Sequence, residues 1–174
     1  MKKIVLTFGL IAGVVMSSMM ILAVTVIDTE HGTGSMVVGY TSMVLAFLMV
    51  YFGVRSYRDN VNGGVLSFGR GFRVGITIAA IGSVFYVATW EVVYRNFMPD
   101  FMEKYAASQI EAERKAGKSE AELAETQKTM AGYVESYKNP LYRAGLTFLE
   151  PLPVGLLMTL IAAGTLRRKS KSPA

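Results

Sequence analysis

The tetrapeptide Glu150-Pro151-Leu152-Pro153 is the stretch whose residue types could do chemistry, because it places a carboxyl and two prolines inside the apolar segment 141–166. A proline has no N–H to donate to the carbonyl four residues before it. The two freed carbonyls and the carboxyl form a group of acceptors, and within a bilayer such groups must find donors on neighbouring helices or water. We therefore interpret Glu150 as the centre of a candidate polar site.

Candidate donors for Glu150 lie on the preceding apolar segment, 74–94, near the end expected at the same depth. Glu91 and Arg95 are four residues apart with the acid first, the favourable order for an ion pair along a helix. Arg95, an indole N–H or a tyrosine hydroxyl on this segment could reach Glu150, whereas Arg143 lies about 10 Å further along Glu150's own helix. If Glu91 and Glu150 face each other, a proton could be held between the two carboxyls. The candidate intramembrane polar site consists of Glu150, Glu91, Arg95, Trp90 and Arg143.

Other kinds of reactive site are missing from the sequence. There is no cysteine, so neither a thiolate site nor a disulfide can form. The one histidine, His31, lies in a short acidic and turn-rich segment, 28–35, where we expect it to be solvated and not a ligand. The sequence contains neither a Gly-x-Ser-x-Gly motif nor paired aspartates for intramembrane hydrolysis. We therefore expect no enzyme activity and no cofactor.

The composition is typical of a membrane protein. Of the residues, 52% are hydrophobic and only 18% are charged, and the mean hydropathy is +0.36, whereas about 25% of residues are charged in soluble domains. The apolar residues are grouped in blocks of membrane-spanning length. The net charge of +5 is concentrated beside these blocks. This arrangement indicates the positive-inside bias of membrane proteins, and we expect no nucleic-acid partner.

Four segments are predicted to cross the bilayer as helices. Short Lys/Arg-rich loops are retained in the cytoplasm, so we place the link 55–73 between spans two and three, and the tail 167–174, on that side. Both termini are therefore predicted to be cytoplasmic. A signal peptide would have a shorter apolar core and a small-residue cleavage box, so we expect the first span to remain uncleaved. The predicted spans are 4–27, 36–54, 74–94 and 141–166, the first three lying within residues 1–95.

The link carries four arginines, for which two interpretations remain open. They could contact the anionic headgroups of the lipid bilayer, or they could serve only to set the topology, which is the interpretation that we favour. The four residues are Arg55, Arg58, Arg70 and Arg73.

Small residues on two spans would allow helices to approach closely. Gly9 and Gly13 form a small-xxx-small pair on span one, and Gly75 and Gly82 give a stripe on span three. Chance is the alternative for the pair, since glycine is frequent in membrane spans.

The insert 96–140 is predicted to be an antiparallel helical hairpin. Pro99 suits the start of one helix and Gly117 its end, and Ser119 with Glu122 forms a capping box for a second helix. Acidic and basic side chains about balance in the insert, which fits an extracytoplasmic location. The predicted fold class is an all-α integral membrane protein: a bundle of four transmembrane helices with an extracytoplasmic helical hairpin between spans three and four.

A series of motifs in order along nearly the whole chain carries a resemblance to a known family. The motifs are Gly39-Tyr40-Thr41-Ser42-Met43, Gly53-Val54-Arg55-Ser56-Tyr57-Arg58-Asp59, Gly64-Val65-Leu66-Ser67-Phe68-Gly69, Tyr86 with Trp90, Met98-Pro99-Asp100-Phe101, Asn139-Pro140-Leu141 and Glu150-Pro151-Leu152-Pro153-Val154-Gly155. In these motifs the chain resembles the bacterial four-span membrane family named domain of unknown function 4199. The resemblance implies a multi-pass architecture in the bacterial cytoplasmic (inner) membrane, but no reaction and no catalytic residues.

Two functional hypotheses follow. In the first, span three satisfies Glu150, the prolines kink span four, and the protein is a structural or interaction protein that presents its hairpin to a membrane-protein partner or to a second copy of itself. In the second, the Glu91/Glu150 region is a proton or cation site, or a substrate contact, of a small transport component, a use that broken helices with intramembrane carboxyls have in transporters. The lack of a detectable internal repeat argues against a complete transporter unless the chain oligomerises.

Overall fold

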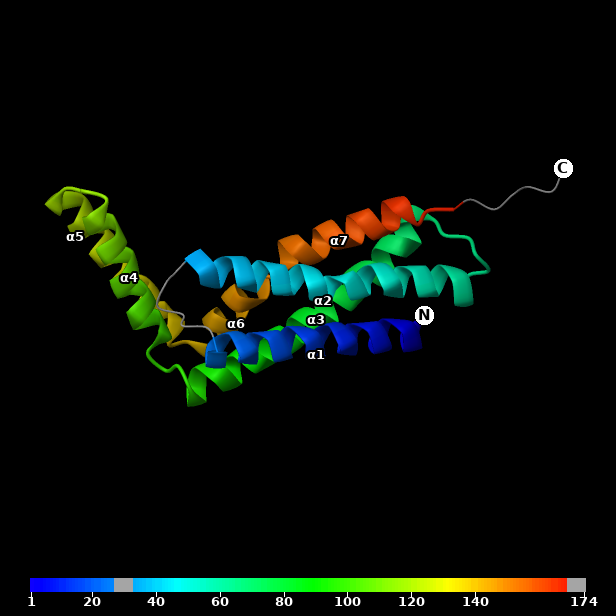
Figure 1. Ribbon diagram of the computed structural model, residues 1–174, viewed down its shortest axis with the longest axis horizontal. Coiled ribbons are helices and arrows are strands. Elements are labelled where there is room, and N and C mark those ends of the chain that lie inside the picture. Colours follow the sequence, from blue (N-terminus) through cyan, green and yellow to red (C-terminus); the bar gives the residue numbers. More distant parts are fainter. Residues whose placement is uncertain (27–32, 169–174) are drawn as a thin grey trace. The chain divides into compact units, whose positions relative to one another are not determined.

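The computed structural model describes residues 1–26 and 33–168, and this part of the chain forms seven helices (Figure 1). His31, Lys169 and Lys171 lie outside the described residues. The helices are α1 (Lys2–Val26), α2 (Thr33–Asn60), α3 (Phe68–Asn96), α4 (Phe101–Lys115), α5 (Glu120–Tyr137), α6 (Pro140–Leu149) and α7 (Leu152–Thr165). The predicted all-α class is confirmed for the described residues, whose one strand-like feature is an isolated antiparallel bridge between Leu66 and Arg168.

Four helical segments in the described chain are long and apolar enough to cross a membrane. The candidate spans contain 24 residues in α1, 24 in α2, 29 in α3 and 26 in α6 and α7 together, with a mean hydropathy of at least 1.7 in each. At a rise of 1.5 Å per residue, the shorter ones reach about 36 Å, which exceeds the ~30 Å hydrocarbon core of a bilayer. They follow the order of the four predicted spans.

The outward faces of these helices are covered with large apolar side chains. A soluble monomer rarely exposes a continuous apolar surface of this kind, whereas lipid tails would cover it at no cost. Examples are Leu6, Val14 and Leu22 on α1, Val44 and Leu48 on α2, and Leu156, Leu157 and Leu160 on α7.

The contacts within the chain divide it into two compact units. The first unit comprises Met1–Thr89 and Phe148–Ala174, and holds α1, α2, most of α3 and α7. The second comprises Trp90–Thr147, and holds the end of α3, the helices α4 and α5, and most of α6.

The core of the first unit lies between α2, α3 and α7. Phe47, Val50 and Val54 on α2 and Ile78 on α3 have no exposed surface. The three α2 residues are spaced by three and four, so they form one stripe along the helix, and this stripe faces the core. The other faces of α2 point away from the core.

Glycines on α1 allow this helix to pack closely against α3. A Cβ added to Gly9 would lie 2.8 Å from the Ile81 side chain, and one added to Gly13 would lie 2.6 Å from the ring of Phe85. The partners Ile81 and Phe85 are themselves one helical turn apart, so the two pairs stack along one contact. The close approach predicted from the small-xxx-small pair is confirmed.

The link between α2 and α3 is shorter than the sequence predicts. The expected loop over 55–73 is mostly helical, because α2 continues to Asn60 and α3 already begins at Phe68. The turn itself uses Gly63 and Gly64, whose φ angles of 62° and 77° are unfavourable for residues with a side chain. Arginine is a good helix former, so the change from apolar to basic residues does not end either helix.

The link lies beside the end of α7. The backbone N–H of Leu66 donates to the carbonyl of Arg168 and the N–H of Arg168 donates to the carbonyl of Leu66, both at 2.9 Å. Figure 1 shows that the start of α1 lies at this same end of the first unit. The basic residues of the N-terminus, the link and the start of the tail therefore gather at one end, which we call the basic end.

The second unit contains the predicted helical hairpin. Helices α4 and α5 lie antiparallel, joined by a turn at Gly117 with φ of 78°. Ser119 and Glu122 form the predicted capping box at the start of α5. The Thr126 hydroxyl donates to the carboxylate of Glu113 at 2.6 Å and so links the two helices. The buried side chains of the hairpin are Met102, Ala106, Leu123 and Tyr137.

The fourth span is interrupted at the predicted position. Helix α6 ends at Leu149 and α7 begins at Leu152, with Glu150 and Pro151 between them. Pro151 keeps near-helical angles, φ −78° and ψ −14°. The missing proline N–H groups therefore interrupt the hydrogen bonds of the span at this point.

Candidate functional site

The residues of the predicted polar site belong to different units of the fold. Glu150 lies in the first unit, whereas Glu91, Arg95, Trp90 and Arg143 lie in the second. Each carboxyl has a partner within its own unit. The polar site is therefore described as two clusters, one around Arg143 and one around Glu150.

Arg143 is the most completely engaged charged side chain in the second unit. Its Nε and Nη2 atoms donate to the two carboxylate oxygens of Glu91, each at 2.7 Å. Its Nη1 atom donates to the backbone carbonyl of Tyr137 at 2.9 Å. The guanidinium carbon also lies 4.2 Å from the centre of the Tyr94 ring, within the range of a cation–π contact. The arginine side chain is only 4% exposed.

Aromatic rings pack on and beside this ion pair, with Tyr94 and Tyr137 lying against the Arg143 guanidinium. The Trp90 indole N–H donates to the Tyr137 hydroxyl at 2.7 Å, and the Trp90 and Phe101 rings meet edge to face with their centres 4.8 Å apart. The Tyr94 and Tyr137 rings meet in the same manner at 5.5 Å. We call the set of Glu91, Arg143, Trp90, Tyr94, Tyr137 and Phe101 the arginine clamp.

The arginine clamp joins three parts of the second unit. Glu91, Trp90 and Tyr94 lie on the last turns of α3, Arg143 lies on the first turn of α6, and the remaining two residues come from α4 and α5. Its arginine makes bidentate, charge-assisted hydrogen bonds, which are strong and directional. It therefore fixes both ends of the hairpin to the ends of the adjoining spans, and its charges are used for positioning.

The predicted pair of Glu91 and Arg95 is present but weaker. Arg95 Nε lies 3.5 Å from Glu91 Oε2, and the Arg95 side chain is 65% exposed. Exposed pairs of this kind contribute about 0.3–0.5 kcal/mol on a helix. Arg143, and not Arg95, is the main partner of Glu91.

The Glu150 cluster is small. The hydroxyl of Tyr86 on α3 donates to Glu150 Oε2 at 2.8 Å. A tyrosine hydroxyl was one of the three kinds of donor that the sequence left open. Within the described part of the chain, the Glu150 carboxylate accepts this one hydrogen bond. The cluster lies beside the interruption of the fourth span. A carboxyl, a phenol and freed backbone carbonyls at that point could hold a proton or contact a cation.

The link arginines differ in how far they are already paired. Arg58 uses Nε and Nη2 to donate to both carboxylate oxygens of Asp59, at 2.6 and 3.1 Å. Arg55 lies further from the same carboxylate, at 3.8 Å, and is 59% exposed. Arg70 donates to the side-chain carbonyl of Asn62 at 2.9 Å, and Arg73 is exposed on α3.

Reasoning from the sequence missed the pairing of Arg143 with Glu91. It compared Arg143 only with Glu150 on the same helix. A signal was available in the sequence: the acid Glu91 lies near the end of span three, and the base Arg143 lies near the start of span four. Charges at such positions are costly unless they are paired. The place of Tyr137 in the clamp had no sequence signal.

Comparisons with known proteins agree with this architecture. The comparisons with curated proteins and with solved structures gave no match. A family model described as protein of unknown function DUF4199 matches residues 7–168, which include all four candidate spans except the first residues of α1. The chain therefore belongs to the DUF4199 family of proteins of unknown function.

Proposed function

We propose that the protein is a structural or interaction protein of the bacterial cytoplasmic membrane, which holds the α4–α5 hairpin outside the cell membrane as a rigid docking element for a membrane-protein partner or a second copy of the chain. The arginine clamp is the observation that carries this proposal. A bidentate ion pair with a buried arginine, lying against the Tyr94 and Tyr137 rings, is placed where the hairpin meets the spans. Such an arrangement is suited to fixing the direction of a protruding element.

The distribution of charge supports the orientation. Lys2, Lys3, the link arginines and Arg168 gather at the basic end, where Asp59 is the one acid in the described segments. The positive-inside rule assigns such an end to the cytoplasm. Because α3 starts at this end and runs continuously to Asn96, the hairpin that follows is assigned to the opposite side of the membrane. No catalytic role is proposed for any residue.

The hairpin surface offers features for a partner. Tyr105 and Tyr133 are 42% and 45% exposed, and tyrosine is enriched at protein interfaces because it provides contact area at a low cost in conformational entropy. Charged residues of both signs lie near them in the sequence, such as Glu103 and Lys104 beside Tyr105 and Glu135 and Lys138 after Tyr133, and a mixture of charges favours a specific orientation over general adhesion.

Site-directed photo-crosslinking tests the docking role. A photo-reactive phenylalanine derivative at Tyr133 is expected to yield one abundant crosslinked product in intact cells, either with a second copy of the chain or with one membrane protein. The same reagent at Leu157, which is 57% exposed on α7, serves as the lipid-facing control. A diffuse set of products at Tyr133, no different from that at Leu157, would contradict the proposal.

A second candidate function, proton or cation movement, is favoured by the Glu150 cluster. Glu150 lies ten residues after the start of α6, in a candidate span of 26 residues. It is therefore about 15 Å along a helix of about 39 Å, and about a third of the way into a centred ~30 Å core. The transport hypothesis drawn from the sequence also includes Glu91, but both oxygens of that carboxylate already accept hydrogen bonds from Arg143. The candidate therefore rests on Glu150 and Tyr86.

Proteoliposomes distinguish the two candidates. If the chain moves protons, a trapped pH-sensitive dye should report flux above that of empty vesicles, and Glu150→Gln should abolish it. Tyr86→Phe, which removes only the hydroxyl, should reduce it. Equal flux for the parent chain, both variants and empty vesicles would remove the transport candidate and leave the docking role.

A further inference from the structure

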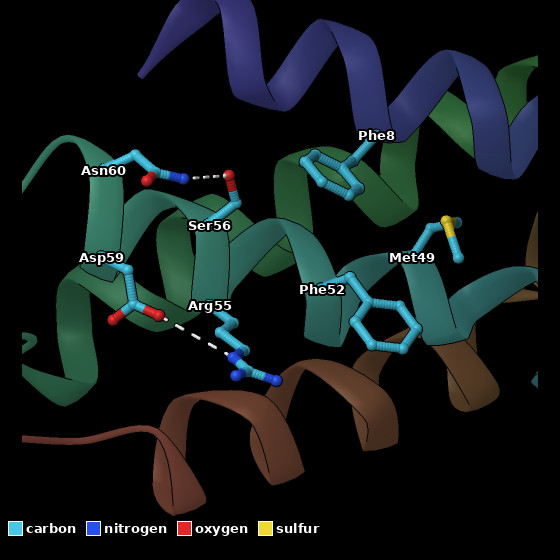
Figure 2. A pocket seen from close by; sticks show the side chains of 7 residues that line it. All are labelled: Phe8, Met49, Phe52, Arg55, Ser56, Asp59 and Asn60. Atoms are coloured by element: carbon cyan, nitrogen blue, oxygen red, sulfur yellow. Dashed lines mark hydrogen bonds and ion pairs between the residues drawn. The ribbon is translucent and has the colours of Figure 1, made fainter.

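A groove lies between α1 and α2 close to the basic end of the first unit (Figure 2). Its volume of about 550 Å³ falls within the range of small-molecule sites. Figure 2 shows Phe8 reaching from α1 over one face of α2, with the other lining side chains on α2. The lining residues are Phe8, Met49, Phe52, Arg55, Ser56, Asp59 and Asn60.

The groove changes from apolar to polar along its length. Its apolar part is formed by Phe8, Met49 and Phe52, and its polar part begins one turn later at Arg55. From Met49 to Asn60 the groove follows α2 for about 16 Å. The headgroup layer is about 5–7 Å thick on each side of a bilayer. The boundary between Phe52 and Arg55 leaves about 10 Å of this length on the polar side and about 7 Å on the apolar side. The groove is therefore long enough to cover the headgroup layer and the adjoining hydrocarbon.

The lining of the polar part holds one arginine and one acid, Arg55 and Asp59, and the neighbouring Arg58 adds a second positive charge. Arg58 already satisfies both carboxylate oxygens of Asp59. Arg55 lies 3.8 Å from the same carboxylate, beyond the 2.7–2.9 Å of a charge-assisted hydrogen bond. Two arginines thus share one acid, and the guanidinium that lines the groove keeps donors for another anion. The Asp59 carboxylate also lines the groove, but its repulsion of an anion is offset by Arg58.

A second donor stands beside Arg55. The Ser56 hydroxyl accepts a hydrogen bond from the Asn60 side chain at 3.1 Å. Among the described residues this hydroxyl acts as an acceptor, and its own O–H can be donated to a ligand. Arg55 and Ser56 are adjacent in sequence and both line the groove. Together they offer a guanidinium and a hydroxyl, the two donor types that commonly bind a phosphate.

We propose that this groove binds one phospholipid with a net negative headgroup, with an acyl chain against Phe8, Met49 and Phe52 and the phosphate on Arg55 and Ser56. The proposal goes beyond a general attraction of basic residues to anionic membranes, because it names one groove and one arginine. It is independent of the docking role of the hairpin. The apolar part of the groove continues directly into the part that carries Arg55. A lipid can fill both parts, whereas a free phosphate would fill only the second, and this is why we propose a lipid.

Native mass spectrometry of the full chain in detergent tests the proposal. Dioleoyl phosphatidylglycerol is the probe, and dioleoyl phosphatidylcholine is the comparison lipid with the same acyl chains and no net charge. We expect one phosphatidylglycerol to bind at least tenfold more tightly than phosphatidylcholine. Arg55→Gln should lower the phosphatidylglycerol affinity about 10- to 100-fold, as expected for loss of hydrogen bonds between charged groups.

Two controls separate the groove from its surroundings. Arg73→Gln removes the same charge on α3, outside the groove, and should change the affinity less than threefold. Phe52→Ser leaves the charge unchanged but removes an apolar wall that is 44% exposed, and should weaken binding at least threefold. Because Arg55 and Phe52 are exposed, both variants should retain the helical circular dichroism of the parent chain.

Three outcomes would overturn the assignment. Equal losses for Arg55→Gln and Arg73→Gln would show a diffuse surface attraction. No effect of Phe52→Ser would show that the acyl chain lies elsewhere. Competition by glycerol phosphate at the same concentration as the lipid would show that the groove takes a free phosphate group and not a membrane lipid.

Discussion

The Glu91→Gln substitution is the most informative perturbation of the arginine clamp. It keeps the shape of the side chain but removes the charge that faces Arg143. The arginine would remain buried with its Tyr137 carbonyl and Tyr94 ring contacts, but without the carboxylate that receives two of its hydrogen bonds. The substitution therefore creates an uncompensated charge in a place that is 4% exposed.

The expected loss follows from this geometry. Removing one partner of a buried ion pair costs about 3–5 kcal/mol of stability. Glu91 is 20% exposed, and the cation–π contact of Arg143 with Tyr94 remains, so the lower end of that range, about 3 kcal/mol, applies. Arg143→Met combined with Glu91→Gln removes both charges. This double variant should be at least 1.5 kcal/mol more stable than the sum of the two single losses, because the two residues are directly coupled.

Hydrogen exchange of the full chain in detergent micelles measures this effect locally. A loss of about 3 kcal/mol corresponds to roughly 100-fold faster exchange of the amides in α4 and α5, while α1 and α2 should exchange as in the parent chain. Arg95→Gln is the matched control, because it removes the exposed partner of the same carboxylate and should change exchange less than threefold. The reasoning is refuted if Glu91→Gln and Arg95→Gln have the same effect on the hairpin.

Two further predictions concern the capping box and the glycine contact. The backbone N–H and hydroxyl of Ser119, together with Lys118, hold the pKa of Glu122 at about 2, well below the ordinary value of a glutamate. The contribution to stability is therefore complete above pH ~4.5 and is lost as the pH falls through 2. Circular dichroism should show a loss of helix over this range that is smaller in Glu122→Gln, and an identical curve for the variant would contradict the role of the box. Gly13→Ala places a Cβ 2.6 Å from the Phe85 ring and should lower stability in thermal unfolding by about 1–3 kcal/mol. Gly164→Ala, with no atom within 4 Å of the added Cβ, should be neutral or stabilising, and equal effects of the two alanines would refute the contact.

Much of the fold could be predicted because each element has a local cause in the sequence. The spans follow from uninterrupted apolar blocks, the hairpin from Gly117 and the Ser119–Glu122 capping box, and the interruption of span four from two prolines. The extent of the link could not be predicted in the same way. Charged residues end an apolar block, but they do not end a helix, so α2 continues to Asn60.

The partners within the polar clusters could be predicted only in part. The residue types at Glu150 indicated that a tyrosine on span three was a suitable donor, and Tyr86 fills that role. The choice of Arg143 as the partner of Glu91 depends on the rotation of two helices about their axes and on the position of Tyr137. These are tertiary quantities, which periodicity within one segment does not encode.

The topology of the chain is tested most directly by cysteine labelling, since the sequence contains no cysteine of its own. Ala121 lies exposed near the start of α5, and Val61 is 50% exposed in the link, so each can be replaced singly by cysteine and treated with a membrane-impermeant maleimide. In intact cells the Ala121→Cys protein should be labelled, and the Val61→Cys protein should be labelled only after the inner membrane is opened. Labelling of Val61→Cys alone in intact cells, or of both variants equally, would contradict the assignment of the hairpin to the outside and the basic end to the cytoplasm.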